Sequence, residues 1–255
     1  GVSVLIYEQT CATEKRRRRK RGTMEDPDVF VAINELVCEG CGDCSVESNC
    51  LSVEPVETEF GRKRRINQSS CNKDYSCVNG FCPSFVTVRG AKRRKREGEG
   101  VDLPALMAEV PAPDLPGLDE PFDLLVTGVG GTGVITVGAL VTMAAHLEGR
   151  GSSVLDFTGF AQKFGTVLSY IRLAERPEDI HQVRIGPNAA DAVIGCDVVV
   201  SSSSKASVHY RNGTRMVLNT AAMPTGDLVL NRDADLKIGR REEVIAGTVG
   251  PANLS

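Results

Sequence analysis

The stretch CEGCGDCSVESNC, residues 38 to 50, places four cysteines within thirteen positions. Cys38, Cys41 and Cys44 follow one another at intervals of three residues. A Cys-x2-Cys-x2-Cys run suits an iron–sulfur cubane, because each thiolate can reach a separate iron and a distant Cys-Pro supplies the fourth ligand. Cys82 precedes a proline. The spacing therefore predicts a [4Fe–4S] cluster held by these four cysteines.

Two glycines support this interpretation of the loop. Gly40 and Gly42 alternate with the cysteines, and glycine lets backbone N–H groups approach cluster sulfurs closely. Three further cysteines, Cys50, Cys71 and Cys77, lie where the ligands of a second cubane would be. We expect a second cluster there. Its fourth ligand is then a non-cysteine group, unless the cluster has three irons or these cysteines are structural.

Other uses of the cysteines fit less well. Disulfides require an oxidising compartment, and nothing in these residues suggests export. A zinc site usually combines two Cys-x-x-Cys knuckles, and the spacings among Cys71, Cys77 and Cys82 do not supply the second. Cys11 and Cys196 are expected to have packing roles, the latter as a small buried residue at a strand edge.

Composition is that of an ordinary globular protein: 255 residues, 41% hydrophobic and 25% charged. No apolar run is long enough to span a bilayer, and we expect a cytoplasmic protein without a membrane partner. The chain begins without Met at a strand-like segment, residues 2–7, which a charged helical tail follows up to residue 22. We expect a piece of a longer polypeptide.

Charge is unevenly distributed, with a net charge of +3 over residues 1–100 and −6 over residues 101–255. Basic runs occupy residues 15–21, 62–65 and 92–96. Because aromatic residues do not interleave with them and acidic residues flank them, we exclude nucleic acid as the partner. A docking surface for an acidic protein fits better, and a solvated face is the alternative.

The second half has an α/β pattern. Residues 30–88 form the cysteine-rich unit and residues 89–121, rich in proline and charge, a linker. From residue 122 onward strands alternate with helical segments, which predicts a doubly wound, mostly parallel sheet. The expected strands are residues 122–129, 153–157, 166–174, 197–202 and 215–220, with a helix over residues 134–149.

A glycine-rich turn joins the first of these strands to the helix. Gly128, Gly130 and Gly133 have the GxGxxG spacing, with Gly131 between them, and Asp156 ends the next strand. Such a turn binds dinucleotide phosphates, but any tight strand–helix turn in a doubly wound sheet also favours glycine. Gln162 and Lys163 lie in the loop after the second strand, where the lysine is either an anion contact or a surface residue.

Taken together and in this order, three segments resemble the middle of the long, fused indolepyruvate ferredoxin oxidoreductases, in the thiamine-diphosphate-dependent 2-oxoacid:ferredoxin oxidoreductase superfamily. The segments are YEQTCATEKRRRRKRG, the cysteine-rich region from Val37 to Val88, and LLVTGVGGTGVITVGALV. The resemblance implies the end of a thiamine diphosphate domain at residues 1–22, a ferredoxin-like domain at 30–88 and a truncated γ-type α/β domain at 122–255. It also lowers the expectation of a nicotinamide site, because that turn is structural in the γ-type domain. Phe164 departs from the family's Gln-Lys-Gly-Gly stretch.

The resemblance further implies an activity. The full-length enzyme, a homo-oligomer, would oxidatively decarboxylate an aryl 2-oxoacid with thiamine diphosphate and Mg²⁺, pass the acyl group to coenzyme A and reduce ferredoxin. This chain would supply the electron relay, with no catalytic residue at the substrate carbon. The alternatives are a free-standing iron–sulfur protein with a nicotinamide- or flavin-binding Rossmann domain, and a zinc-stabilised interaction module.

Overall fold

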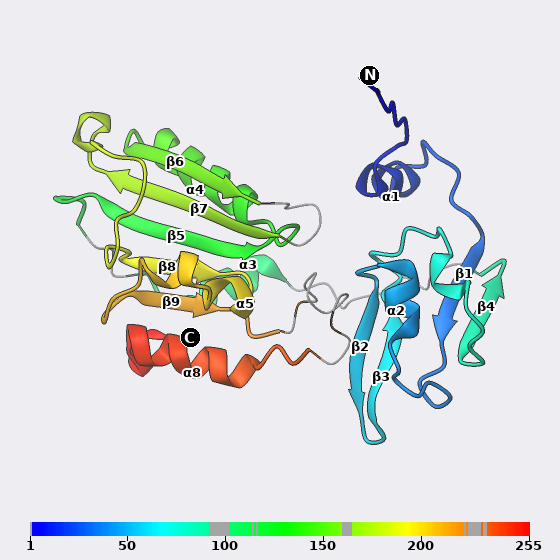
Figure 1. The fold of residues 1–255 in the computed structure, drawn as a ribbon. Helices are drawn as coiled ribbons and strands as arrows, with labels where there is room; N and C mark the ends of the chain where they lie inside the picture. Colours follow the sequence, from blue (N-terminus) through cyan, green and yellow to red (C-terminus); the bar gives the residue numbers. More distant parts are fainter. Residues whose placement is uncertain are drawn as a thin grey trace. The chain divides into compact units, whose positions relative to one another are not determined.

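The structure is a computed structural model that describes residues 2–91, 102–113, 115, 117–159, 165–221, 223, 231 and 234–255 (Figure 1). It divides into two compact units, which we describe separately. The first comprises residues 1–95 with 226–234, and the second residues 96–225 with 235–255. Among the described residues, no helix is both long and apolar enough to cross a bilayer.

The start of the first unit differs from the prediction. Residues 2–10 form no strand, and the side chains of Val4, Leu5 and Ile6 are exposed. The strand pattern is present, but among the described residues no neighbouring strand pairs with it, and a strand without a partner has no ladder to stabilise it. The charged tail does form a helix, α1 (Ala12–Lys20).

Two small antiparallel pairs frame the cysteine-rich region. Strand β1 (Val29–Ile33) pairs with β4 (Phe85–Arg89), so that the first and last strands of this region lie side by side. Strand β2 (Val53–Thr58) and β3 (Gly61–Ile66) form a hairpin. Helix α2 (Asp43–Ser48) packs against the short 3-10 helix η1 (Ser76–Val78).

The core of this region is small and rich in sulfur. Its buried residues are Ile33, Cys38 and Val53. Five partly buried residues pack against them: Cys44, Cys50, Ile66, Cys77 and Phe85. Few large apolar side chains are buried here, so a bound inorganic group would add a substantial part of the interior.

The second unit contains a five-stranded sheet with the order β6-β7-β5-β8-β9. Its strands are β5 (Phe122–Val129), β6 (Gly151–Thr158), β7 (Thr166–Ala174), β8 (Ala192–Gly195) and β9 (Arg215–Leu218). Strands β5, β8 and β9 are parallel neighbours, whereas β7 is antiparallel to both β5 and β6. The α/β class is confirmed.

The expectation of a mostly parallel, doubly wound sheet is wrong in half of the strand pairings. Only residues 159–165 separate β6 from β7. A parallel crossover needs about a dozen residues or more. This short connection therefore imposes an antiparallel pair, and β7 occupies the position beside β5 that a parallel strand would take.

Helices cover both faces of the sheet. Alternate residues of β5 point to opposite sides: Val126 packs against α4 (Val134–Leu147), and Leu125 lies in the core on the other side. That second core includes residues of α5 (Val198–Ser201), α6 (Ser204–Ser207) and α8 (Ile238–Val249). Figure 1 shows α4 and α5 on opposite sides of the sheet. The remaining short helices are α3 (Leu103–Glu109), η3 (Pro177–Asp179) and η4 (Pro251–Asn253).

The strand expected at residues 197–202 is a helix. Its first residue, Asp197, is fully buried and caps α5 by accepting hydrogen bonds from the backbone N–H groups of Val199 (2.8 Å) and Val200 (3.0 Å). The β-branched run suggested a strand, but an aspartate that accepts from the first free N–H groups of a helix favours the helix. The strand lies just before it, as β8.

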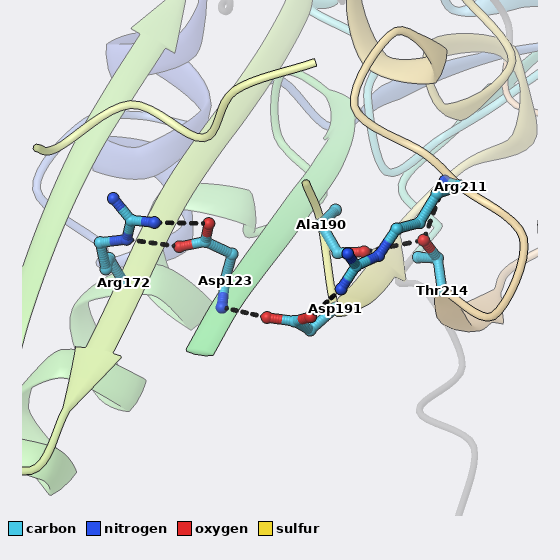
Figure 2. A network of polar contacts seen from close by, with 6 residues as sticks. All are labelled: Asp123, Arg172, Ala190, Asp191, Arg211 and Thr214. Atoms are coloured by element: carbon cyan, nitrogen blue, oxygen red, sulfur yellow. Dashed lines mark hydrogen bonds and ion pairs between the residues drawn. The ribbon is translucent and has the colours of Figure 1, made fainter. Parts of the chain in front are cut away.

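Charged residues pair where β5 begins. Arg172 Nε and Nη2 donate to the two carboxylate oxygens of Asp123 at 2.7 and 2.9 Å, as Figure 2 shows. The backbone N–H of Asp123 donates to Asp191, which also binds Arg211. Burial raises the pKa of Asp123, and the Arg172 guanidinium opposes that rise. The pair is costly to bury, so each member depends on the other.

Candidate metal centre

A cavity of about 330 Å³ opens within the first unit at the cysteine-rich loop. Five cysteines line it: Cys38, Cys41, Cys44, Cys77 and Cys82. Pro83, Ile33 and Phe85 contribute apolar walls. Its volume is far above the roughly 30 Å³ share of one water molecule. The structure thus brings together the four cysteines that the sequence assigns to the first cluster.

Backbone N–H groups point at the sulfurs. The N–H of Gly40 donates to Cys38 Sγ at 3.3 Å, that of Ser52 to Cys50 Sγ at 3.4 Å, and that of Lys73 to Cys71 Sγ at 3.4 Å. Each bond joins a cysteine to the residue two positions later. Such N–H···S bonds stabilise thiolate charge and tune cluster potentials.

Gly40 is required by the course of the backbone. Its φ is +76°, and an added Cβ would lie 3.2 Å from the carbonyl carbon of Arg62 and closer still to its oxygen. The loop that carries Cys38 and Cys41 therefore packs directly on strand β3. Gly42, with φ +81°, is the N-cap of α2, which carries Cys44. Two left-handed glycines shape the turn between successive cysteines.

The surroundings of Cys44 and Cys77 raise the pKa of both thiols. Burial raises the pKa of Cys44, and the neighbouring Cys38 and Cys41 add to the rise. Burial raises the pKa of Cys77 to about 11, and Cys71 and Cys50 contribute further. Cys38, Cys41 and Cys44 line one cavity, and Cys50 and Cys77 pack against the same small core.

A buried arginine lies beside the first group. Arg64 is 1% exposed and lines the cavity, and its positive charge opposes the rise that burial causes in the pKa of Cys44. Buried arginine is rare unless it is compensated by negative charge. Thiolates and an iron–sulfur cluster would supply negative charge at this place.

The donor set fits a cluster better than a single ion. A zinc ion needs four ligands about 2.0–2.3 Å from one centre. Within the ranges that the structure describes, no three His, Cys, Asp or Glu side chains are arranged to hold one ion. All nine cysteines are free thiols. A cubane is different because each thiolate binds its own iron, and thiolates are the usual ligands of iron–sulfur clusters.

The glycine-rich turn of the second unit lies between β5 and α4, as expected. Gly131 and Gly133 have φ values of +96° and +92°, and Gly133 is the N-cap of α4. Beside the turn is a cavity of about 260 Å³, lined in part by Gly130 and Val167. At Gly128, a Cβ would meet Cys196 Cβ at 2.9 Å. Gln162 and Lys163 lie outside the described residues.

Two features of this turn do not suit a dinucleotide. The backbone N–H of Val129 donates to Asp197 Oδ2 at 2.7 Å and that of Gly130 to Gly165 at 2.8 Å, so these donors are used within the protein. In dinucleotide-binding folds, the acidic residue comes from the adjacent parallel strand. Asp156 lies on β6, and antiparallel β7 separates that strand from β5.

Sequence reasoning missed three residues at or near these sites: Arg64, Asp74 and Asp197. Arg64 lies in a basic run that we interpreted only as surface charge. Asp197 precedes a β-branched run that concealed its capping role. Asp74 lies three residues from both Cys71 and Cys77, at the place where Cys41 lies between Cys38 and Cys44. This spacing was a usable signal. The packing role expected for Cys11 is wrong, because Cys11 is exposed at the N-cap of α1.

Parts of the chain are similar to known oxidoreductases. Residues 123–246 match the family model described as pyruvate ferredoxin/flavodoxin oxidoreductase. The indolepyruvate oxidoreductase subunits IorB of Thermococcus kodakarensis and Pyrococcus horikoshii are 31% and 30% identical to this chain over 78 residues. Each of these matches covers 31% of this chain and 37% of the relative.

A solved structure also aligns with part of the chain. The pyruvate oxidoreductase subunit PORC of Thermotoga maritima is 16% identical, with a TM-score of 0.33, over 42% of this chain and 58% of that one. The chain spans little more than a third of the length of the curated relatives that it matches.

Proposed function

We propose that the chain belongs to the 2-oxoacid:ferredoxin oxidoreductase superfamily, and that its first unit binds iron–sulfur clusters and relays electrons to ferredoxin. One cluster is held by Cys38, Cys41, Cys44 and Cys82. The observation that carries this proposal is the cavity at which all four side chains meet. Cys50, Cys71 and Cys77 hold a second cluster.

We propose further that the reaction served is the oxidative decarboxylation of an aryl 2-oxoacid, of the indolepyruvate type, to an acyl-coenzyme A. The similarity to the IorB subunits supports this substrate class. Thiamine diphosphate and Mg²⁺ would supply the carbon chemistry in the complete enzyme. The residues of this chain would hold the relay, and N–H···S bonds and burial would set its potential.

Anaerobic reconstitution tests the relay. The chain is prepared without oxygen with iron and sulfide, and iron, acid-labile sulfide and the EPR spectrum of the reduced protein are measured. We expect iron and sulfide in equal amounts, and loss of one cluster signal in Cys41→Ser. Cys196→Ser is the matched control and should keep every signal. A folded, colourless protein without iron would refute the proposal.

Docking of ferredoxin is tested by salt. Helix α1 presents Arg17 and Arg18 at its surface, each ion-paired with Glu14, and carries further basic residues in its last turn. An acidic partner steered by these charges binds more weakly as ionic strength rises, because mobile ions screen exposed charges. Ferredoxin affinity that does not change with salt would contradict a charge-steered docking surface.

A further inference from the structure

The second group of cysteines repeats the spacing of the first with one substitution. Cys38, Cys41 and Cys44 lie at intervals of three residues. Cys71 and Cys77 lie six residues apart, and Asp74 occupies the middle position. In two-cluster ferredoxins the fourth cysteine of each run ligates the other cluster. By that rule Cys82 completes the first cluster and Cys50 joins the second.

Contacts in the structure join parts of this set. Cys50 and Cys77 pack against the same small core. The backbone N–H of Lys73, the residue before Asp74, donates to Cys71 Sγ at 3.4 Å. The backbone N–H of Ser76, the residue before Cys77, donates to Asp74 Oδ1 at 3.2 Å. Local hydrogen bonds therefore hold Asp74 within the loop that runs from Cys71 to Cys77.

The backbone around Asp74 has an unusual conformation. Lys73 and Tyr75, its two neighbours, have φ values of +54° and +62°. Non-glycine residues rarely adopt this region, and they keep such a conformation where surrounding contacts hold it in place. Here the contacts are present: Lys73 Nζ forms an ion pair with Asp26 at 2.9 Å, and Tyr75 Oη donates to the Val29 carbonyl at 3.1 Å. The loop is held on both sides of Asp74.

One carboxylate oxygen is used within the loop. Asp74 Oδ1 accepts hydrogen bonds from Ser76 N (3.2 Å) and Ser76 Oγ (3.0 Å). In both hydrogen bonds the acceptor is Oδ1, and Oδ2 is not used in either of them. Ser76 thus orients the carboxylate and leaves an anionic oxygen for a metal. The side chain is exposed, so approaching iron meets little steric barrier.

We propose that the Asp74 carboxylate is the fourth ligand of a second [4Fe–4S] cluster whose other ligands are Cys50, Cys71 and Cys77. The proposal rests on the proposed function, since it assumes that this unit binds clusters. It resolves the shortage of one thiolate without a three-iron cluster. A carboxylate is a harder ligand than a thiolate and binds cluster iron less tightly. The iron at Asp74 is therefore the one most readily exchanged.

The test compares Asp74→Asn and Asp74→Cys with the unaltered chain, each reconstituted anaerobically with excess ferrous iron and sulfide. Asparagine keeps the acceptor for Ser76 and removes the anionic ligand, whereas cysteine restores a thiolate. Ser76→Ala is the matched control, because it removes the orienting hydroxyl and leaves the carboxylate. Iron content, EPR of the oxidised and reduced states, and iron loss to a chelator are measured.

We expect about eight irons per chain in the unaltered protein, in two four-iron clusters. Asp74→Asn should lose about one iron and show a three-iron EPR signal, while the first cluster is unchanged. Asp74→Cys should keep both four-iron clusters, shift the potential of the second and slow its iron loss at least tenfold. Ser76→Ala should retain both four-iron clusters.

Three results would overturn the proposal. One is an Asp74→Asn protein that keeps two four-iron clusters with the same potentials. Another is an unaltered protein with one four-iron and one three-iron cluster after reconstitution. The third is an unaltered protein with only the first cluster, which would leave the proposed relay in place. Absence of both clusters would instead refute the proposed function itself.

Discussion

Replacing Gly40 by alanine should destabilise the loop that carries Cys38 and Cys41, and the loss of stability should exceed that from the same change at another left-handed glycine. Gly40 has φ +76°, and Gly61 in the β2–β3 hairpin has φ +87°. Each substitution forces a Cβ into the left-handed region, at a cost of about 1–2 kcal/mol. At Gly61 nothing lies within 4 Å of the added atom. This position therefore isolates the conformational cost.

At Gly40 a steric cost is added. The Cβ would overlap the carbonyl group of Arg62, which belongs to a paired strand and cannot rotate away as a side chain can. Overpacking of this kind costs about 1–3 kcal/mol. We expect Gly40→Ala to destabilise the unit by about 2–5 kcal/mol and Gly61→Ala by about 1–2 kcal/mol. The difference corresponds to a factor of about 5 or more in the folding equilibrium.

Native-state hydrogen exchange measures this locally. The chosen amides are those of β2 and β3, which report opening of the first unit without interference from the second. Iron content after anaerobic preparation gives a second measurement, and Gly40→Ala should lower it while Gly61→Ala preserves it. Equal protection and equal iron in the two variants would refute the reasoning that the Gly40–Arg62 contact determines the loop.

Three further outcomes are expected. Arg64→Met should lower the midpoint potential of the first cluster by on the order of 60 mV, or about 1.4 kcal/mol for one electron, because a nearby positive charge favours the reduced cluster. A redox titration followed by EPR measures the potential, and Arg64→Lys should keep it close to that of the unaltered protein. Asp197→Ala should destabilise the second unit by about 2–4 kcal/mol, because three backbone N–H groups lose their acceptor; urea unfolding checks it, and a loss no larger than that of exposed Asp235→Ala would contradict the capping role. Asp123→Asn should lower the free energy of unfolding by about 3–5 kcal/mol, because it leaves Arg172 buried without its charge partner. In the same unfolding assay the double variant Asp123→Leu with Arg172→Met should recover much of that loss, and an additive loss would contradict the mutual dependence of the two residues.

Local patterns in the sequence predict much of this fold. The alternation in residues 166–174 and the apolar run at 122–129 predict β7 and β5 with the bounds observed. Residues 134–149 predict α4 to within two residues. These elements are long and strongly patterned, so local preference and tertiary packing agree.

The direction of the strands depends on connections, and there the prediction fails. The short link between β6 and β7 excludes a parallel crossover, but the general α/β pattern obscured it. At residues 197–202 the β-branched side chains have a propensity for strands. The segment is nevertheless a helix, because the buried Asp197 caps its first turn and also contacts β5. Tertiary context outweighs weak local preference in both cases.

The candidate metal centre was more accessible to sequence reasoning than the sheet. The four cysteines proposed to hold the first cluster follow from spacing alone, because a cubane restricts the distances between cysteines. Asp74 was overlooked because only cysteines were counted, although it has the position of a ligand. The role of Arg64 could not be inferred from sequence. Its neighbours in the basic run are at least partly exposed, and only its place on β3 directs it into the interior.

The pairing of β1 with β4 has a consequence for how this region can be joined to other proteins. Val29 lies opposite Arg89, and the N–H of Gly90 donates to the Asp28 carbonyl at 3.1 Å, so the polypeptide enters and leaves the region at neighbouring points. A segment whose two ends meet can be placed between other domains, or removed from between them, without forcing their chain ends apart. Gene fusion could therefore move the cysteine-rich region from one protein to another as a unit, together with any group that its cysteines bind.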